Sequence, residues 1–286
     1  IIAYPTASAG PNQTRCANST CSLASATATE YSTLSWSSSG SGTFDDPADL
    51  NPVYTPSAAD TAAHSVILTL IAYGNSPCSP DTSSMTLTIN PVAVAHAGPD
   101  DKICEGSSYL LSGTSASGYT SLSWTSSGSG ASGFVPAGDL HPVYTPTAAD
   151  IAGGSVTLTL TANPYPQCAA ANDAMTLYIS RQVLANAGQD GQVCQNGTFP
   201  VTTAASQYDS AHYWTHNGSG MLTGATTLTP VYTPGAGETG PVTLTLHSLA
   251  YYPCDDVTDA MTLTVNPVAV AHAGPDDKIC EGSSYL

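Results

Sequence analysis

The residues best suited to chemistry in this sequence are clustered carboxylates. The tetrapeptide GPDD places Asp100 beside Asp101, and the same letters return at Asp276 and Asp277. Carboxylate oxygens are hard ligands that suit Ca²⁺, and calcium at the junctions of tandem extracellular modules makes such arrays stiffer. The sequence therefore predicts junctional calcium sites at these four residues. Solvated turns explain the same aspartates, and no cluster matches a defined calcium-binding loop.

A pair of histidines offers a second kind of metal site. His212 and His216 lie two residues to either side of Trp214, so all three share a face if the segment is a strand. Two adjacent imidazoles can bind Zn²⁺ or Cu²⁺, but the sequence offers no obvious third ligand. The sequence also lacks the GxSxG, HExxH and P-loop motifs. We therefore expect no enzymatic activity and no required cofactor, with calcium as the open alternative.

These residues belong to a repeated framework with a period of about 88 residues. Each of three tryptophans precedes a Gly-Ser-Gly turn, each of three VYTP motifs follows, and three strand-like blocks (SVILTL, SVTLTL and PVTLTL) come next. A Met-Thr-Leu block ends each copy. The copies divide the chain into repeat 1 (residues 1–89), repeat 2 (90–179), repeat 3 (180–265) and the first strands of repeat 4 (266–286). Residues 266–286 are identical to residues 90–110.

The repeated blocks predict β-strands. Val156, Leu158 and Leu160 alternate with threonines, which is the period-2 pattern of a half-buried strand. About seven short strands in about 88 residues is the size of an immunoglobulin-like sandwich. We therefore predict an all-β fold, a tandem array of Ig-like β-sandwich domains whose stiff junctions make an extended rod. In such a sandwich each tryptophan is expected in the core, with an exposed sugar-stacking platform as the alternative.

The cysteines recur with the same period. The simplest pairing joins two cysteines of one repeat and closes loops of about sixty residues, each stabilising by about 4 kcal/mol. It gives the bonds Cys16–Cys78, Cys104–Cys168 and Cys194–Cys254. Cys280 would then pair outside the sequence given. Cys21 has no counterpart in the other repeats, and we consider it as a buried thiol, a competitor for Cys78 or an intermolecular bridge. Oxidised pairs indicate an extracytoplasmic location.

Composition excludes several partners. The chain carries 21 acidic and 4 basic residues, for a formal net charge of −17. Nucleic acid and anionic membrane surfaces need a basic footprint that this chain lacks. No apolar run approaches the roughly 20 residues of a membrane helix, so we expect no membrane insertion of this segment. The first residues lack the features of a signal peptide, and we interpret the sequence as an internal stretch of a longer secreted protein.

The block order resembles a known class of repeats. The segments SGSGTFDDPADLNPVYTPSAADTAAHSVILTL, MTLTINPVAVAHAGPD and ICEGSSYLLSG are similar to the tandem Ig-like or PKD-like repeats of giant secreted cell-surface proteins of Bacteroidota, including gliding-motility-type adhesins. The resemblance covers essentially the whole chain. It implies export, display on the bacterial cell surface and no catalytic residues. It also implies O-glycosylation at Thr61 and Ser210, which lie in short Asp-Ser/Thr-apolar patterns.

These observations lead to two functional hypotheses. The first is a structural stalk or filament of a cell-surface fibre, part of a giant adhesin. The alternative is an array of carbohydrate- or surface-binding modules, with a polysaccharide or surface ligand. The partners we expect are the neighbouring repeats of the same polypeptide and laterally associated chains, because edge strands of open sandwiches can pair between molecules.

Overall fold

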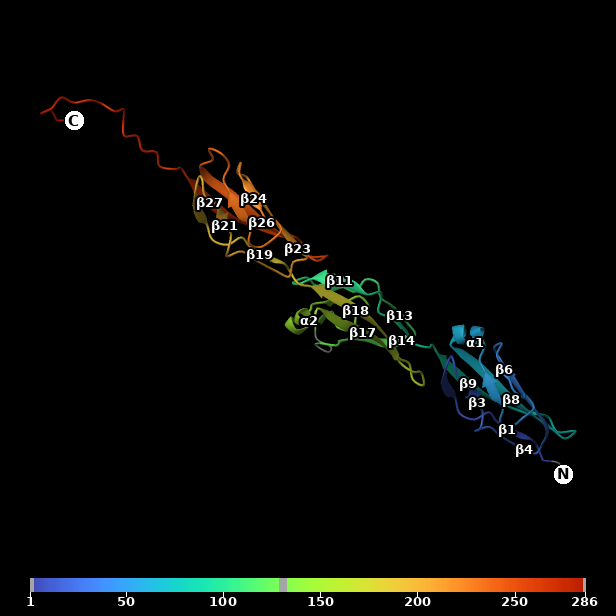
Figure 1. Cartoon of the computed structure of the whole chain (residues 1–286). Coiled ribbons are helices and arrows are strands. Elements are labelled where there is room, and N and C mark those ends of the chain that lie inside the picture. Colours follow the sequence, from blue (N-terminus) through green and yellow to red (C-terminus); the bar gives the residue numbers. More distant parts are fainter. Residues whose placement is uncertain (1–2, 129–132, 285–286) are drawn as a thin grey trace. The chain divides into compact units, whose positions relative to one another are not determined.

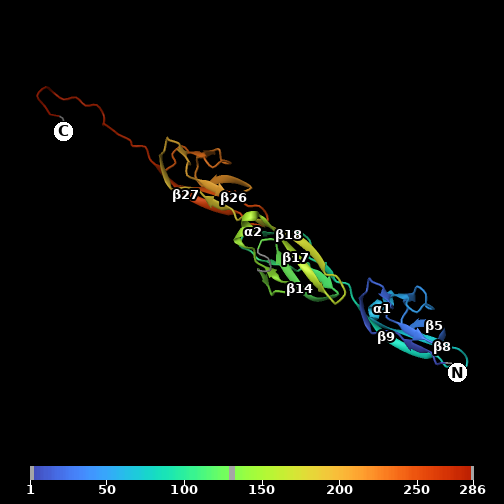
Figure 2. The same cartoon turned by 90° about the horizontal axis from the view of Figure 1, so that it is seen from below.

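The computed structural model describes residues 3–128 and 133–284 and is built almost entirely of β-strands (Figures 1 and 2). The predicted all-β fold of tandem sandwiches is confirmed. The chain divides into two compact units, Ile1–Ile179 with repeats 1 and 2, and Ser180–Leu286 with repeat 3 and the segment that follows it. No described helix is long and apolar enough to cross a membrane.

Repeat 1 is a sandwich of a four-stranded and a three-stranded sheet, with a two-stranded ribbon beside them. Their strand orders are β2-β9-β8-β5, β3-β7-β6 and β1-β4. The elements are β1 (Thr6–Ser8), β2 (Gln13–Cys16), β3 (Cys21–Ser22), β4 (Thr27–Thr29), β5 (Tyr31–Ser38), β6 (Thr43–Phe44), β7 (Val53–Thr55), α1 (Ala58–Ala63), β8 (Ser65–Gly74) and β9 (Asp81–Asn90).

Repeat 2 has the same topology. Its sheets have the orders β11-β18-β17-β14, β12-β16-β15 and β10-β13. The elements are β10 (Val94–His96), β11 (Asp101–Cys104), β12 (Tyr109–Leu110), β13 (Ser115–Ser117), β14 (Tyr119–Ser126), β15 (Phe134–Val135), β16 (Val143–Tyr144), α2 (Ala148–Gly153), β17 (Ser155–Pro164) and β18 (Ala171–Ser180).

Repeat 3 repeats the arrangement with a turn in place of the short helix. Its sheets have the orders β20-β27-β26-β23, β21-β25-β24 and β19-β22. The elements are β19 (Leu184–Asn186), β20 (Gly191–Cys194), β21 (Phe199–Pro200), β22 (Ala205–Gln207), β23 (Ala211–His216), β24 (Met221–Thr223), β25 (Val231–Thr233), β26 (Gly240–Leu249) and β27 (Val257–Asn266).

The alternating threonines and aliphatic residues set the faces of the central strands. Val156 and Leu158 of β17 are buried and lie opposite Leu177 and Met175 of β18, while the intervening threonines face outward. Side chains at every second position of a strand point to the same face, so one face of this sheet is apolar and packs on the three-stranded sheet. The same pattern builds a separate core in each repeat.

The repeated tryptophans lie in these cores. Trp36, Trp124 and Trp214 are each at most 4% exposed, which confirms the interpretation of these residues as core and excludes an exposed sugar-stacking platform at them. In repeat 2 the rings of Trp124 and Phe134 are 5.7 Å apart, and Phe134 lies 4.8 Å from the ring of Tyr144. The tyrosine of each VYTP motif is fully buried as well.

The structure corrects the expected disulfide pairing. Cys16 is bonded to Cys168, a residue 152 positions away in the next repeat, so the expected bonds Cys16–Cys78 and Cys104–Cys168 are wrong. Cys104 and Cys254 are also disulfide-bonded. Cys194 is an exposed thiol, so the expected bond Cys194–Cys254 is wrong too.

Strand direction explains the error. β2 runs parallel to β9, and Cys16 lies opposite Asn90 at the end of β9. Cys78 precedes Asp81, the first residue of the same ten-residue strand. At about 3.3 Å per residue, roughly 30 Å separate the two ends of β9. A disulfide needs Cα atoms within about 7 Å of each other, so the two cysteines of one repeat cannot meet.

The segment after β27 differs from its identical copy. Residues 267–284 contain no strand, whereas residues 91–108 include β10 and β11. The partners of those two strands are β13 and β18 of repeat 2, and no described residue after β27 forms an equivalent strand. The strands of this segment therefore depend on contacts with the remainder of a repeat.

Candidate functional site

The first joint is the contact between repeats 1 and 2, formed by Cys16, Asn90 and Pro91 with the loop of residues 164–170. The disulfide from Cys16 to Cys168 has a Cα–Cα distance of 5.0 Å. Beside it, the Asn90 side-chain amide donates a hydrogen bond of 2.9 Å to the carbonyl oxygen of Pro166. The first joint is therefore held by one covalent bond and by a hydrogen bond next to it.

The loop carrying Cys168 also lies against the connector. The Cys168 sulfur is 3.4 Å from the carbonyl oxygen of Pro91, and Tyr165 lines a shallow cavity with His64 and Asn90. Cys16 is only 3% exposed in this arrangement. No local sequence pattern indicates this contact, although the shared period of the cysteines is compatible with pairing between consecutive repeats.

The connector at the start of repeat 3 contacts the equivalent loop of that repeat. The Ser180 hydroxyl donates a hydrogen bond of 3.0 Å to the Tyr252 carbonyl oxygen, and the Gln182 side chain donates one of 3.1 Å to the Asp255 carbonyl oxygen. The Cys254 sulfur is 3.4 Å from the Ser180 carbonyl oxygen. Repeats 2 and 3 thus present their second cysteine to the connector that precedes them.

The acidic residues of the connectors have structural partners. Asp100 accepts a hydrogen bond of 2.7 Å from the Thr176 backbone N–H, which ties the connector to β18. Asp101 accepts one of 2.8 Å from the Lys102 N–H, and burial together with the Asp101 carboxylate raises the pKa of Tyr109 to about 12. Asp277 accepts a hydrogen bond from the Lys278 N–H. Calcium at Asp100, Asp101, Asp276 and Asp277 stays a prediction.

Equivalent acceptors occur in the other repeats. Asn12 accepts a hydrogen bond of 2.8 Å from the Thr86 N–H, and Asp190 accepts one of 2.7 Å from the Thr262 N–H. An uncharged amide therefore fills this position in repeat 1. Within residues 3–128 and 133–284, no group of three His, Cys, Asp or Glu side chains is arranged to hold a metal ion.

A second repeated carboxylate, missed in the sequence, ties the ribbon to the main sheet. Asp173 accepts a hydrogen bond of 2.8 Å from the Ala97 N–H, and Asp259 accepts one of 2.7 Å from the Ala187 N–H. In repeat 1 a serine hydroxyl takes this place. The signal available in the sequence was a polar residue two positions before each repeated methionine.

The most buried carboxylate in each of the first two repeats follows the VYTP motif. Asp60, 2% exposed, accepts hydrogen bonds from the Tyr54 hydroxyl (2.8 Å) and from the backbone N–H groups of Ser41, Gly42 and Ser57 (2.9–3.0 Å). Burial acts to raise the pKa of Asp60, but these hydrogen bonds outweigh it and hold the pKa below its ordinary value. This network anchors α1 and the Gly-Ser-Gly turn to the core.

Repeats 2 and 3 contain the same network. Asp150 accepts a hydrogen bond of 2.8 Å from the Tyr144 hydroxyl. In repeat 3, Glu238 takes this role and accepts hydrogen bonds from Tyr232 (2.9 Å) and from the Ser219 N–H (2.7 Å). The longer glutamate side chain compensates for the loss of the helical turn. The divergent GAGE sequence therefore still supplies a carboxylate that accepts hydrogen bonds from the VYTP tyrosine and the Gly-Ser-Gly turn, as the AAD sequence does.

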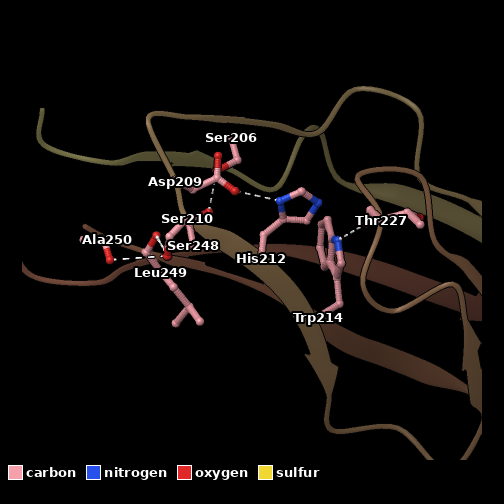
Figure 3. A network of polar contacts seen from close by, with 9 residues as sticks. All are labelled: Ser206, Asp209, Ser210, His212, Trp214, Thr227, Ser248, Leu249 and Ala250. Carbon is pink, nitrogen blue, oxygen red and sulfur yellow. Dashed lines mark hydrogen bonds and ion pairs between the residues drawn. The ribbon is translucent and has the colours of Figure 1, made fainter. Parts of the chain in front are cut away.

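The two histidines of β23 have different surroundings, and only His212 belongs to a local network of polar contacts. The Asp209 carboxylate lies 2.7 Å from His212 Nδ1, and this contact with His212 lowers the pKa of Asp209 most. Figure 3 shows the His212 imidazole between Asp209 and Trp214. His216 instead packs edge-on against Tyr232. In the network drawn, no serine hydroxyl is hydrogen-bonded to His212, so the imidazole is not placed to activate a serine nucleophile.

Both candidate glycosylation residues use their hydroxyl groups in the fold. Thr61 donates a hydrogen bond of 3.1 Å to the Ser57 carbonyl oxygen within α1. Ser210 donates one of 3.2 Å to the Leu249 carbonyl oxygen, as Ser32 and Thr120 do at the same place in the other repeats. Ser210 is exposed. O-glycosylation of Thr61 and Ser210 stays a prediction.

Cys21 and Cys280 lie outside the joints. Cys21 is a buried thiol whose sulfur is 3.4 Å from the Gln13 side-chain oxygen, and burial raises its pKa. Cys280 is an exposed thiol in the strandless segment after β27. Neither therefore contributes to the contacts between repeats 1 and 2.

Comparison with known proteins identifies the fold. No protein-family model and no curated protein sequence matches the chain. Among solved structures, the chain is similar to the I-band fragment I67–I69 of titin (TM-score 0.57) and to an E-to-A variant of titin domains I67–I69 (TM-score 0.59). Each match covers 93% of this chain and 100% of the titin fragment, at 10% identity. The fold is immunoglobulin-like. At this identity the similarity shows the fold alone, and it agrees with the tandem sandwiches predicted from the sequence.

Proposed function

We propose that this chain is a structural segment of an extracellular stalk or filament on a bacterial cell surface, part of a giant adhesin. The disulfide between Cys16 and Cys168 is the observation that carries this proposal, because it joins two successive immunoglobulin-like repeats covalently. A disulfide inside one repeat would stabilise that repeat. A disulfide between repeats instead resists their separation, which is the property that a fibre under tension needs.

The distribution of aromatic side chains supports a scaffold. The tryptophan and the VYTP tyrosine of every repeat are buried, so the repeated aromatic residues build cores. The connector carboxylates, the buried Asp60 and Asp150, and the half-buried Glu238 are likewise engaged in backbone hydrogen bonds. The conserved architecture of the three repeats therefore serves folding and joining. The formal net charge of −17 favours repulsion between chains in solution at low ionic strength.

Labelling of the producing cells tests this function. Antibodies raised against the folded chain should decorate extracellular fibres in electron micrographs, and preimmune serum should not. Labelling confined to the cell interior, or to isolated globular particles, would overturn the proposal. A second grid treated with a calcium chelator tests the calcium proposal separately: calcium at the connectors predicts that the fibres become more flexible, and unchanged fibres remove it.

Carbohydrate binding is the alternative function, and one surface feature favours it. The rings of Tyr213 and His247 stack in parallel, with centroids 4.6 Å apart, and Tyr213 is 39% exposed. Exposed aromatic rings are common platforms for sugars. Polysaccharide binding by the intact chain that is lost in Tyr213→Ala, but kept in a variant of the exposed Tyr4, would support this function. Binding that is unchanged in both variants would exclude this platform.

A further inference from the structure

The end of repeat 3 presents one side of a joint like the first joint. We call Cys194 and Asn266 the open half-joint. β20 runs parallel to β27 and places Cys194 opposite Asn266, as β2 places Cys16 opposite Asn90. The adjacent backbone contact is also the same: the Gln195 N–H donates to the Asn266 carbonyl oxygen at 2.9 Å, and the Ala17 N–H donates to the Asn90 carbonyl oxygen at 2.9 Å.

The two half-joints differ in what covers them. Cys16 is 3% exposed because it is bonded to Cys168 under the loop of repeat 2, whereas Cys194 is an exposed thiol. The Asn90 amide donates to the Pro166 carbonyl oxygen across the first joint. The amide of Asn266 instead donates at 3.2 Å to Gln192 of its own repeat. The open half-joint therefore has the donor and the sulfur of the first joint without the loop that engages them.

The segment that follows the open half-joint indicates which kind of partner fits. Residues 266–286 repeat the sequence of residues 90–110, which begin repeat 2, the repeat whose loop covers Cys16. Ile103 is 7% exposed in the core of repeat 2, but its counterpart Ile279 is 54% exposed. Ala269 is exposed, while its counterpart Ala93 is 5% exposed in the same core. Ile279 and Ala269 thus occupy positions that are buried in the core of repeat 2.

We propose that the open half-joint is the docking surface for the cysteine-bearing loop of a repeat that begins at Asn266, and that Cys194 forms a disulfide with the cysteine of that loop. This inference rests on the proposed function, because it makes the covalent joint a recurring connection of the fibre. The loop would match residues 164–170 in form: a tight turn with a cysteine that reaches the carbonyl oxygens of the preceding connector.

The bond requires an oxidant. The Cys194 thiolate attacks an oxidised thiol carrier to give a mixed disulfide, and the thiolate of the incoming loop then displaces the carrier. Two thiols become one disulfide, and the two electrons and two protons leave with the carrier, which is reduced to dithiol. Oxidised glutathione supplies this chemistry in solution and is reduced to two molecules of glutathione.

An extended chain tests the proposal. Residues 111–179 are appended after Leu286, so that residues 266–286 lead into a second copy of repeat 2. After oxidation in a glutathione buffer, mass spectrometry of unreduced peptides should find Cys194 linked to the appended copy of Cys168. Alkylation of Cys194 should be lost in the extended chain and retained in the original chain.

Two matched variants separate docking from folding. In the extended chain, Cys194→Ser and, separately, a serine in place of the appended cysteine should leave the appended repeat protected from hydrogen exchange while the cross-link is lost. A folded appended repeat beside a fully alkylated Cys194 would overturn the proposal. So would cross-links that form only between molecules and increase with protein concentration. The cross-linking experiment uses the purified chain, so its outcome is independent of the antibody labelling. The disulfide of Cys194 can be absent even if the antibody labels extracellular fibres, and it can form even if the antibody does not.

Discussion

Reduction of the bond between Cys16 and Cys168 should change how repeats 1 and 2 respond to force. A pull applied at the N-terminus and at Leu184 passes along the chain to Cys16 and crosses the disulfide directly to Cys168. Residues 17–167 carry no load while this bond is intact. β1, β2 and β18 stay in the load path, but unfolding of either repeat cannot then release the length of residues 17–167.

The hidden length follows from the sequence separation of the two cysteines. The bond bridges 152 residues and spans 5.0 Å between its Cα atoms. A fully extended chain reaches at most about 3.3–3.6 Å per residue, so reduction should release roughly 500–550 Å of additional length. The pairing of cysteines within repeats would hide two separate loops and leave both repeats under load.

Single-molecule force spectroscopy measures this length. Between handles at the N-terminus and at Leu184, the intact chain should not release the length of residues 17–167, and this release should appear after addition of a reductant. The double variant Cys16→Ser/Cys168→Ser should release the same length without reductant. Release of this length in the unreduced chain with both cysteines present would refute the load path.

Three further predictions concern the repeats themselves. Asp60→Asn places an amide against several hydrogen-bond donors and should destabilise repeat 1 by about 3–5 kcal/mol. Hydrogen-exchange protection of repeat 1 should then fall at least about 100-fold. Tyr54→Phe removes only one donor and should destabilise repeat 1 by about 1–2 kcal/mol. Because the pKa of Asp60 is lowered on folding, its stabilisation is present above the ordinary pKa of 3.8 and is lost as the pH falls through the folded value. Hydrogen-exchange protection of repeat 1 should therefore decline as the pH falls, and it should decline less steeply in Asp60→Asn than in the unchanged chain. An equal decline in the two proteins would contradict this reasoning. Trp124→Ala should cost about 3–5 kcal/mol in repeat 2 and leave protection of repeat 3 unchanged; loss of protection in both would contradict independent cores.

The sequence was sufficient for the fold because its signals are local and repeated. The alternation of Val156, Leu158 and Leu160 with threonine defines a strand and its buried face without knowledge of its partner. The position of each tryptophan within such a block placed it in the core. Repetition of the same blocks three times then fixed the size of the repeat and, with it, the class of sandwich.

The disulfide pairing of the first joint could not be predicted from the sequence because it depends on strand direction. Spacing alone made Cys78 the natural partner of Cys16. The parallel pairing of β2 with β9 places Cys16 at the far end of the sandwich, and no local pattern announces a parallel pair. The role of Glu238 was missed for a related reason. A glutamate in a divergent turn replaces an aspartate on a helix, and only the shared contact with the VYTP tyrosine reveals the equivalence.

The covalent connection between successive repeats is the central claim, and peptide mapping of the unreduced chain tests it most directly. Free thiols are blocked with an alkylating reagent before digestion, and linked peptides are identified by mass spectrometry. The structure predicts a cross-link between the peptides that contain Cys16 and Cys168, together with alkylated Cys194. A cross-link between Cys16 and Cys78 would contradict the account and restore a disulfide inside each repeat.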